Sequence, residues 1–246
     1  MTLRHIKLTI AYDGSNYHGW QEQPGKETIQ GLVKKALKML TFSDIEIVGA
    51  SRTDAGVNAL GQVVAFKIDS PIPTENFSKA ITDKLPPNII VTNAEEMPLN
   101  FDVIKSVKRK LYRYTIHNGA IRPVLHLNHC WHIPWKLDVT AMNKAATLLK
   151  GKKDFKSFAS AADSRENSVR TIFHSEVTSE RNWVYYDVEG NGFLYNMVRN
   201  IVGTLVEIGR GKYDFDKITK ILKAKHRTAA GQLAPPHGLC LMWIKY

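Results

Sequence analysis

One short stretch gathers the residue types that could do chemistry. Residues 49–62 read GASRTDAGVNALGQ, and the acid within them is Asp54. Arg52 lies two positions before that carboxylate and small residues follow it, so a cation can hold the acid ionised and a substrate has room to approach. An ionised aspartate in a closed site can act as a nucleophile or as a base. The alternative is an ordinary turn, because Asp-Ala-Gly is common turn chemistry.

A second candidate site joins cations to two tyrosines. No acid lies between Asp102 and Asp138, and this stretch opens with five basic residues: Lys105, Lys108, Arg109, Lys110 and Arg113. Tyr112 and Tyr114 share one face if the run is a strand, because strand side chains repeat every two residues. Cations beside aromatic rings suit phosphates beside stacked bases, which makes Lys108, Arg109 and Lys110 candidate RNA ligands. The alternative is a solvated basic edge with two tyrosines in the core.

A third candidate is Arg199, in the run MVRNIVG of residues 197–203. The segment around it is strongly apolar and has a helical pattern. A guanidinium in such a helix needs an anionic partner, because a buried unpaired charge is costly. The alternative is that Arg199 reaches solvent from a partly exposed face of the helix.

Several other kinds of site lack support. The His and Cys residues of segment 126–132 do not have a zinc-site spacing, so no metal is expected. The chain has no P-loop, no G-x-G-x-x-G after a strand and no G-x-S-x-G, which leaves ATP, NAD and serine-hydrolase chemistry unsupported. Cys130 and Cys240 give no disulfide framework, which favours a reducing, cytoplasmic setting. The N-terminal segment is predicted to be a strand rather than a signal peptide, and no apolar run reaches the ~18–20 residues of a membrane span.

The charge is distributed unevenly along the chain. The 246 residues hold 34 Lys and Arg against 23 Asp and Glu, a net charge of +11. Residues 1–107 carry a net charge of −1 and residues 108–246 carry +12, so the excess lies in the second half. A polyanion is the natural partner, nucleic acid first and an anionic membrane surface second. The alternative is a protein that is basic without such a partner.

The spacing of apolar residues predicts the elements that must position these candidates. In the first half, strands are expected over 6–12, 45–50, 62–68 and 89–92, and helices over 29–40 and 74–85. Thr28 is a good N-cap for the first helix. The order is βαββαβ, the ferredoxin-like arrangement. Asp54 then falls in the loop between the second and third strands, where scaffolds commonly carry functional residues.

The second half repeats this order. Strands are expected over 111–117, 171–177, 183–189 and 239–245, and helices over 138–149 and 195–208, with an additional short basic helix from Asp214. Asp138 is the predicted N-cap of its helix and Gly151 follows its end. We therefore predict an α+β (α/β) protein of two ferredoxin-like βαββαβ domains with mainly antiparallel sheets, over residues 1–104 and 105–246.

Several motifs together resemble those of the tRNA pseudouridine synthase A family. The run SRTDAGVNALGQVVAF, residues 51–66, resembles the catalytic motif that the family writes around R-T-D-A-G-V-H-A. Five further groups match in order: YDG and YHGWQ near the start, KLYRY at 110–114, DF with SF and then RTI in the middle, MVRNIVG at 197–203, and APPHGL at 234–239. The resemblance runs from about residue 5 to the C-terminus, which makes it highly specific.

The resemblance implies an enzyme that isomerises uridine to pseudouridine in the anticodon stem-loop of tRNA, at positions 38–40. It also implies two ferredoxin-like domains that flank a central RNA-binding cleft, a homodimer, and no cofactor. The reaction must cleave N1–C1′, rotate the uracil and join C5 to C1′. A duplex hides these atoms, so the nucleotide has to be flipped out.

The resemblance also implies a role for each candidate. Asp54 matches the catalytic aspartate, which could attack C1′, add to the base or abstract a sugar proton. Arg199 matches the basic residue that pairs with this aspartate, and Tyr112 matches the active-site tyrosine, whose ring can stack on the flipped base. Arg52 matches the arginine associated with base flipping. One departure is Asn58, which stands where the family usually has histidine; asparagine keeps a donor and an acceptor but loses the titratable ring.

Two other functions compete with this interpretation. A non-catalytic RNA-binding protein could share the topology and the basic half, but the strands lack the K/R-G-F/Y-G/A-F signature of such modules. Asp54 would also have no purpose there, because a carboxylate repels phosphate. A hydrolase of the glycosidase kind would usually need a second, paired acid, and none is evident.

Overall fold

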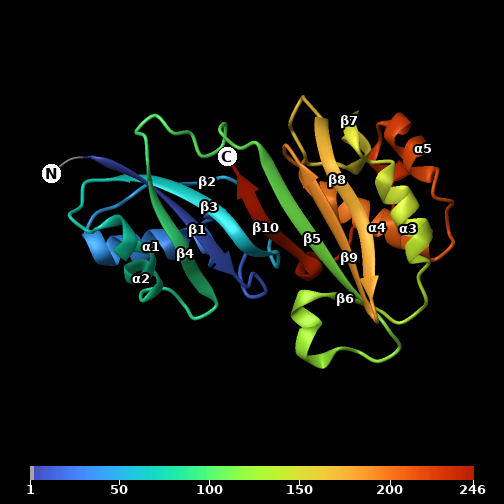
Figure 1. Cartoon of the computed structure of the whole chain (residues 1–246), viewed down its shortest axis with the longest axis horizontal. Helices are drawn as coiled ribbons and strands as arrows, with labels where there is room; N and C mark the ends of the chain where they lie inside the picture. The colour runs from blue at the N-terminus through green and yellow to red at the C-terminus, as the bar shows by residue number, and fades with distance from the viewer. Residues whose placement is uncertain (1–2) are drawn as a thin grey trace. The chain divides into compact units, whose positions relative to one another are not determined.

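The computed structural model describes residues 3–246, which form two compact units (Figure 1). The first unit contains the chain up to Lys108 together with Cys240–Tyr246, and the second contains Arg109–Leu239. The C-terminal strand, which we expected over residues 239–245, is present and is grouped with the first unit from Cys240 onward. Domains over 1–104 and 105–246 remain a proposal about the family's organisation.

The first unit follows the order βαββαβ. Its elements are β1 (Arg4–Tyr12), α1 (Ile29–Thr41), β2 (Ile47–Gly49), β3 (Asn58–Ile68), α2 (Thr74–Thr82) and β4 (Ile89–Met97), to which β10 (Leu239–Lys245) is added. Strand β1 pairs antiparallel with both β3 and β4, and β2 pairs antiparallel with β3. Strand β10 runs parallel to β3. Helices α1 and α2 contact each other and pack against this sheet (Figure 1).

The predicted local signals of the first unit hold in the structure. The Thr28 side chain accepts a hydrogen bond from the Gly31 N–H and caps α1. The alternation in β1 buries Ile6, Leu8 and Ile10, which are fully buried in the core. The helix cap and the strand alternation depend only on neighbouring residues, so both could be predicted from the sequence.

The second unit builds its sheet around two long strands. Its strands are β5 (Arg109–Asn118), β6 (Trp131–Ile133), β7 (Gly151–Asp154), β8 (Val169–Glu180) and β9 (Trp183–Gly190), and its helices are α3 (Val139–Thr147), α4 (Met197–Gly209) and α5 (Lys217–Ala224). Strand β9 lies between β5 and β8 and is antiparallel to both. Helices α3 and α4 pack together, and α3 also contacts β8. Four 3₁₀ turns complete the unit: Val124–His129, Lys156–Phe158, Arg227–Ala229 and Pro236–Gly238.

Helix α3 ends earlier than its predicted stop. Asp138 caps its start by accepting the Ala141 N–H at 2.9 Å, as predicted. After Thr147 the N–H groups of residues 148–150 bond three residues back, so the chain tightens before Gly151. Gly151, with a φ of 98°, is the first residue of β7 rather than a helix cap.

The whole is a mixed α+β protein with mainly antiparallel strand pairing, as predicted. No helix within residues 3–246 is long and apolar enough to cross a bilayer. Over the same residues, no three His, Cys, Asp or Glu side chains are arranged to hold a metal ion.

Candidate active site

Asp54 lies on the loop between β2 and β3, which we call the Asp54 loop (residues 50–57). The loop contains a tight turn, in which the Val57 N–H donates to the Asp54 carbonyl at 3.1 Å. Asp54 is half-buried, and two other residues of the loop, Thr53 and Val57, are buried. A turn and a functional carboxylate, the two alternatives for this segment, are therefore compatible, because Asp54 is itself part of the turn.

The residue before Asp54 is held at both its side chain and its backbone. The Thr53 hydroxyl hydrogen-bonds the Tyr12 hydroxyl at 2.7 Å, and the Thr53 carbonyl accepts the Trp20 N–H at 3.0 Å. The Tyr12 and Trp20 rings stack, with centroids 6.4 Å apart. Trp20 is 1% exposed. Two motifs near the N-terminus therefore fix the backbone that carries Asp54.

Glycines allow these segments to approach the loop closely. Gly19 has a φ of 86°, and a Cβ there would lie 2.6 Å from the Thr53 carbonyl oxygen. A Cβ on Gly14 would lie 2.0 Å from the Val57 carbonyl oxygen. Both distances are too short for any larger residue, so the glycines of YDG and YHGW are required by contact with the Asp54 loop.

Two buried amide side chains fix the ends of the loop. The Asn58 Oδ1 accepts the Gly14 N–H at 2.8 Å, and the Gln62 Nε2 donates to the Ser51 carbonyl at 2.6 Å. Gln62 is fully buried. We did not assign a role to Gln62 from the sequence. Its signal was a long polar side chain inside the apolar strand β3, because a buried amide has to find partners.

Arg52 is on the exposed side of the Asp54 loop. Because Arg52 is exposed, a ligand in solvent can reach its guanidinium. This is compatible with the role that the family resemblance implies for it, and it adds no contact that fixes the loop.

Tyr112 lies on β5, opposite Val188 of β9, and is 6% exposed. Its ring meets the Phe193 ring edge to face, with centroids 5.2 Å apart. Tyr114 shares its face of the strand, as predicted, but is fully buried and donates its hydroxyl to the Pro235 carbonyl at 2.8 Å. Burial raises the pKa of Tyr114 far above its usual range. Tyr114 is therefore a core residue.

Arg199 is in the first turn of α4 and is half-buried. Its Nε donates to the Ala234 carbonyl at 2.8 Å and its Nη1 to the Asn196 Oδ1 at 3.1 Å. Both acceptors are neutral and belong to the same unit. The APPHGL motif, which supplies Ala234, thus orients the guanidinium that the MVRNIVG motif carries.

The basic run beside Tyr112 is partly neutralised by acids of β9. Arg109 forms an ion pair with Glu189 at 2.9 Å and lies 4.4 Å from the centroid of the Phe173 ring. Arg113 binds Asp187 through two hydrogen bonds, of 2.8 and 2.7 Å. The basic run itself contains no acid, because Glu189 and Asp187 lie more than 70 residues after their partners. Only the pairing of β5 with β9 places these acids beside the run.

Lys108 and Lys110 differ in their surroundings. Lys108 is exposed, whereas Lys110 is half-buried. Burial lowers the pKa of the Lys110 ammonium to about 8, and repulsion by Arg165 adds to this effect. The predicted site residues therefore divide between the units: Asp54, Arg52 and Lys108 belong to the first, and Arg109, Lys110, Tyr112 and Arg199 to the second.

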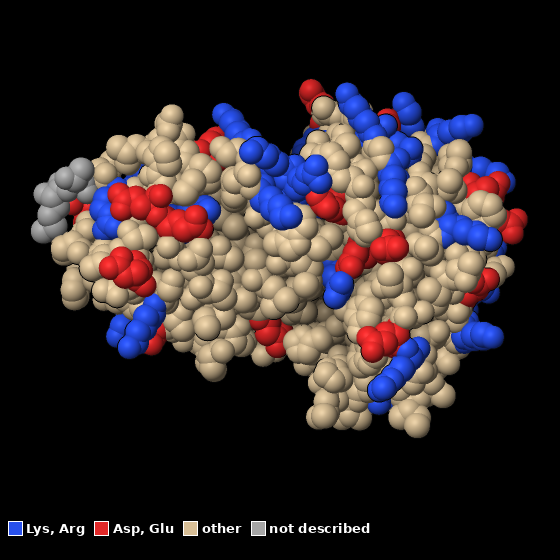
Figure 2. Space-filling model, viewed as in Figure 1, with Lys and Arg blue, Asp and Glu red and all other residues tan. Residues whose placement is uncertain are grey.

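The second unit carries most of the positive charge. It holds 21 Lys and Arg against 11 Asp and Glu, a net charge of +10. Figure 2 shows basic side chains spread over the visible face of this unit. A surface of this charge favours a polyanionic ligand.

Comparisons with known proteins agree with the motifs. The tRNA pseudouridine synthase family matches residues 8–104 and 145–246. "tRNA pseudouridine synthase A" of Caldicellulosiruptor saccharolyticus is 43% identical over 244 residues, covering 99% of this chain and 100% of that protein. The protein of the same name from Ruminiclostridium cellulolyticum is 44% identical over 245 residues, covering 99% and 100%.

A chain of a solved Cbf5–Nop10–Gar1 complex has a TM-score of 0.35 and 11% identity to this chain, covering 81% of this chain and 53% of that one. The full-length relatives and the family match lead to one conclusion. The chain belongs to the tRNA pseudouridine synthase family, a family of isomerases.

Proposed function

We propose that this protein isomerises uridine to pseudouridine in the anticodon stem-loop of tRNA, at positions 38–40, with Asp54 as the catalytic residue. The observation that carries the proposal is the construction of the Asp54 loop. Two glycines, a buried tryptophan and two buried amides fix a turn whose half-buried residue is a carboxylate. A turn with no chemical task would not need this support.

The reaction is an isomerisation without net oxidation or hydrolysis. The N1–C1′ bond breaks, C5 bonds to C1′, the proton on C5 leaves and N1 gains one. No redox partner or external energy is required, so we propose no cofactor. The carboxylate of Asp54 acts in its ionised form, on the sugar or on the base.

Tyr112, Arg52 and Arg199 are the proposed substrate-binding residues. Tyr112 has a flat ring that can stack on a flipped uracil and a hydroxyl that can reach the proton on C5. Hydrogen bonds to the Ala234 carbonyl and the Asn196 Oδ1 help to orient Arg199. The exposed Arg52 can hold a phosphate or fill the space that the flipped base leaves.

Lys108, Arg109 and Lys110 are the proposed contacts to the RNA backbone. The net charge of +10 on the second unit supports this, because phosphate contacts supply most of the affinity for RNA. We further propose that the protein works in the cytoplasm, where tRNA is modified, and as a homodimer. Sedimentation velocity of the purified protein tests the dimer: a species of twice the mass of the chain supports it, and a monomer at all concentrations contradicts it.

Mapping pseudouridine in unmodified tRNA after incubation with the purified protein tests the function. We expect new pseudouridine in the anticodon stem-loop and none in a parallel reaction with Asp54→Asn. Pseudouridine elsewhere in the tRNA would contradict the proposed target. RNA that is bound but unchanged would contradict the enzymatic function.

A further inference from the structure

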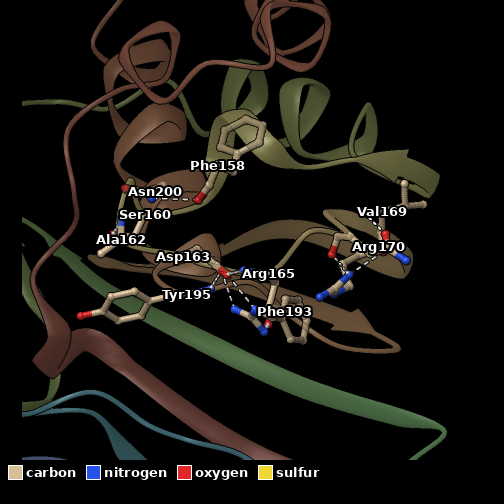
Figure 3. Close-up of polar contacts among 11 residues, drawn as sticks. Phe158, Ser160, Ala162, Asp163, Arg165, Val169, Arg170, Phe193, Tyr195 and Asn200 are labelled. Carbon is tan, nitrogen blue, oxygen red and sulfur yellow. Dashed lines mark hydrogen bonds and ion pairs between the residues drawn. The ribbon is translucent and has the colours of Figure 1, made fainter.

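A loop of the second unit closes on a buried carboxylate. Asp163 is 4% exposed at its side chain and accepts hydrogen bonds from Arg165 Nε at 2.8 Å and Nη2 at 2.5 Å (Figure 3). It also accepts the Tyr195 N–H at 2.7 Å. The Ser160 N–H donates to the Tyr195 carbonyl at 2.8 Å. These bonds tie residues 160–165 to residues 193–195, and we call the assembly the Asp163 clasp.

The clasp leaves part of the Arg165 guanidinium available. A guanidinium has five N–H donors. Arg165 uses two on Asp163 and a third on the Phe193 carbonyl, at 3.0 Å. Its side chain is 46% exposed, so the remaining donors can reach a ligand in solvent. The carboxylate thus fixes the orientation of Arg165, while two of its N–H donors, one on Nη1 and one on Nη2, remain for a ligand.

The clasp adjoins the tyrosine that we propose to bind substrate. Phe193, whose carbonyl accepts from Arg165, packs its ring edge to face against Tyr112. Figure 3 shows Arg165 and Phe193 close together, to the right of Tyr195. A ligand held by Arg165 would therefore lie near the proposed uracil-binding ring.

Other cations surround the clasp. Arg165 repels both Lys110 and Arg170 strongly enough to lower their pKa values, although burial is the larger cause for each. Arg170 Nη1 donates to the Asn167 and Val169 carbonyls, and Gly192, which has no side chain, lies beside it: a Cβ there would lie 3.8 Å from the Arg170 Nε. Arg165, Lys110 and Arg170 thus form a group of cations around the clasp, and such a group favours a negatively charged ligand.

We propose that Arg165, with Lys110 and Arg170, binds a phosphate of the tRNA backbone next to Tyr112, and that Asp163 is the positioning residue for Arg165. The proposal rests on the proposed function, which supplies the RNA. A backbone phosphate fits because arginine binds phosphate through paired hydrogen bonds, and because the half-exposed Arg165 side chain keeps two N–H donors that a strand of RNA can reach.

Phosphate ethylation interference tests the contact. We expect one phosphate of the tRNA whose ethylation weakens binding by the wild-type protein but no longer weakens binding by Arg165→Gln. The Arg165→Gln variant should bind tRNA roughly tenfold more weakly. The slope of log affinity against log salt should also fall by about one.

Lys144→Gln is the matched control, because Lys144 is an exposed cation on α3 and its loss removes the same charge. It should leave the interference pattern and the affinity unchanged. Identical interference patterns in the wild type and Arg165→Gln would overturn the proposal.

Asp163→Asn separates positioning from simple electrostatics. Removing a negative charge beside the RNA would strengthen binding if Asp163 acted through its charge alone. If Asp163 positions Arg165, the same substitution weakens binding and erases the same interference site, with a KM that rises and a kcat that changes little. Tighter binding by Asp163→Asn would contradict the positioning role.

The outcome of this experiment is distinguishable from that of the proposed function. Binding and interference are measured without turnover. A wild-type protein that makes no pseudouridine but shows the Arg165-dependent phosphate would contradict the proposed function and support the phosphate contact. A wild-type protein that makes pseudouridine but lacks that phosphate would support the proposed function and contradict the contact.

Discussion

At the scale of single residues, the position of Asp54 depends on side chains far from it in sequence. Thr53 is held by Tyr12 and Trp20, and the backbone of Gly19 passes so close that no Cβ fits. The roles of Asp54 and Tyr112 stay predictions, which rest on motifs that resemble those of a known family. The hydrogen bond from Gln62 and the clasp at Asp163 could not be predicted, because each depends on partners that are distant in the sequence and that only the fold brings near.

Gly19→Ala should displace the Asp54 loop. The new methyl group would collide with the Thr53 carbonyl oxygen, and alanine would have to adopt the left-handed backbone conformation of Gly19, which it disfavours. We therefore expect the free energy of unfolding to fall by about 2–5 kcal/mol and most of the activity to be lost. Gly25→Ala is the control, because Gly25 has a φ of 68° but nothing within 4 Å of its added Cβ. Urea denaturation of both variants measures the difference. Equal effects would show that contact with Thr53 is unimportant.

Asn58→His should keep the loop in place at neutral pH. A neutral imidazole can present Nδ1 where the Asn58 Oδ1 now accepts the Gly14 N–H, but a protonated ring only donates. Activity of the variant should therefore fall as pH drops through about 6.5, the ordinary pKa of histidine, while the wild type changes less. Asn58→Ala should lose activity at every pH. A pH profile of Asn58→His that matches the wild type would contradict this role of Asn58.

The ammonium of the half-buried Lys110 should lower the free energy of unfolding, most strongly below pH 8. The pKa of its ammonium is about 8 in the folded protein and 10.5 ordinarily, so between these values the unfolded chain holds the proton more tightly. Raising the pH through this window therefore favours the folded state. Lys110→Met should be more stable than the wild type at pH 7, by about 1–3 kcal/mol, and this gap should narrow by pH 10.5. A gap that widens over that range, measured by urea denaturation, would contradict the burial of Lys110.

At the scale of elements, strand pairing decides which cations remain available. Residues 105–113 look uniformly basic in the sequence, but β9 places Glu189 against Arg109 and Asp187 against Arg113. Helix caps at Thr28 and Asp138 were predictable because capping is local. The short strands β6 and β7, and the parallel pairing of β10 with β3, carry no local signal, since distant segments create them.

Lys108 should contribute more to RNA affinity than Arg109. Glu189 already offsets the charge of Arg109, which also stacks on Phe173, whereas Lys108 is exposed. Lys108→Gln should reduce the slope of log affinity against log salt by about one, and Arg109→Gln by less. Titrations of tRNA at several salt concentrations measure both. A larger effect of Arg109→Gln would show that its ion pair opens on binding.

At the scale of the whole molecule, the two units differ in charge and in what they carry. The first unit, with a net charge of +1, holds the Asp54 loop, and the second unit, with +10, holds Tyr112, Arg199 and the clasp. The charge asymmetry was readable from the sequence. The parallel pairing of the C-terminal strand β10 with β3 was not, because the two segments lie far apart in the sequence. Binding and chemistry should therefore be separable by substitution.

Release of tritium from tRNA that carries 5-tritiated uridine tests this separation most directly, because the label leaves only when C5 forms its new bond. Asp54→Asn should release it about 10²–10⁴-fold more slowly than the wild type while binding tRNA with an affinity within about threefold. Tritium release by Asp54→Asn at the wild-type rate would show that the carboxylate does not perform the chemistry.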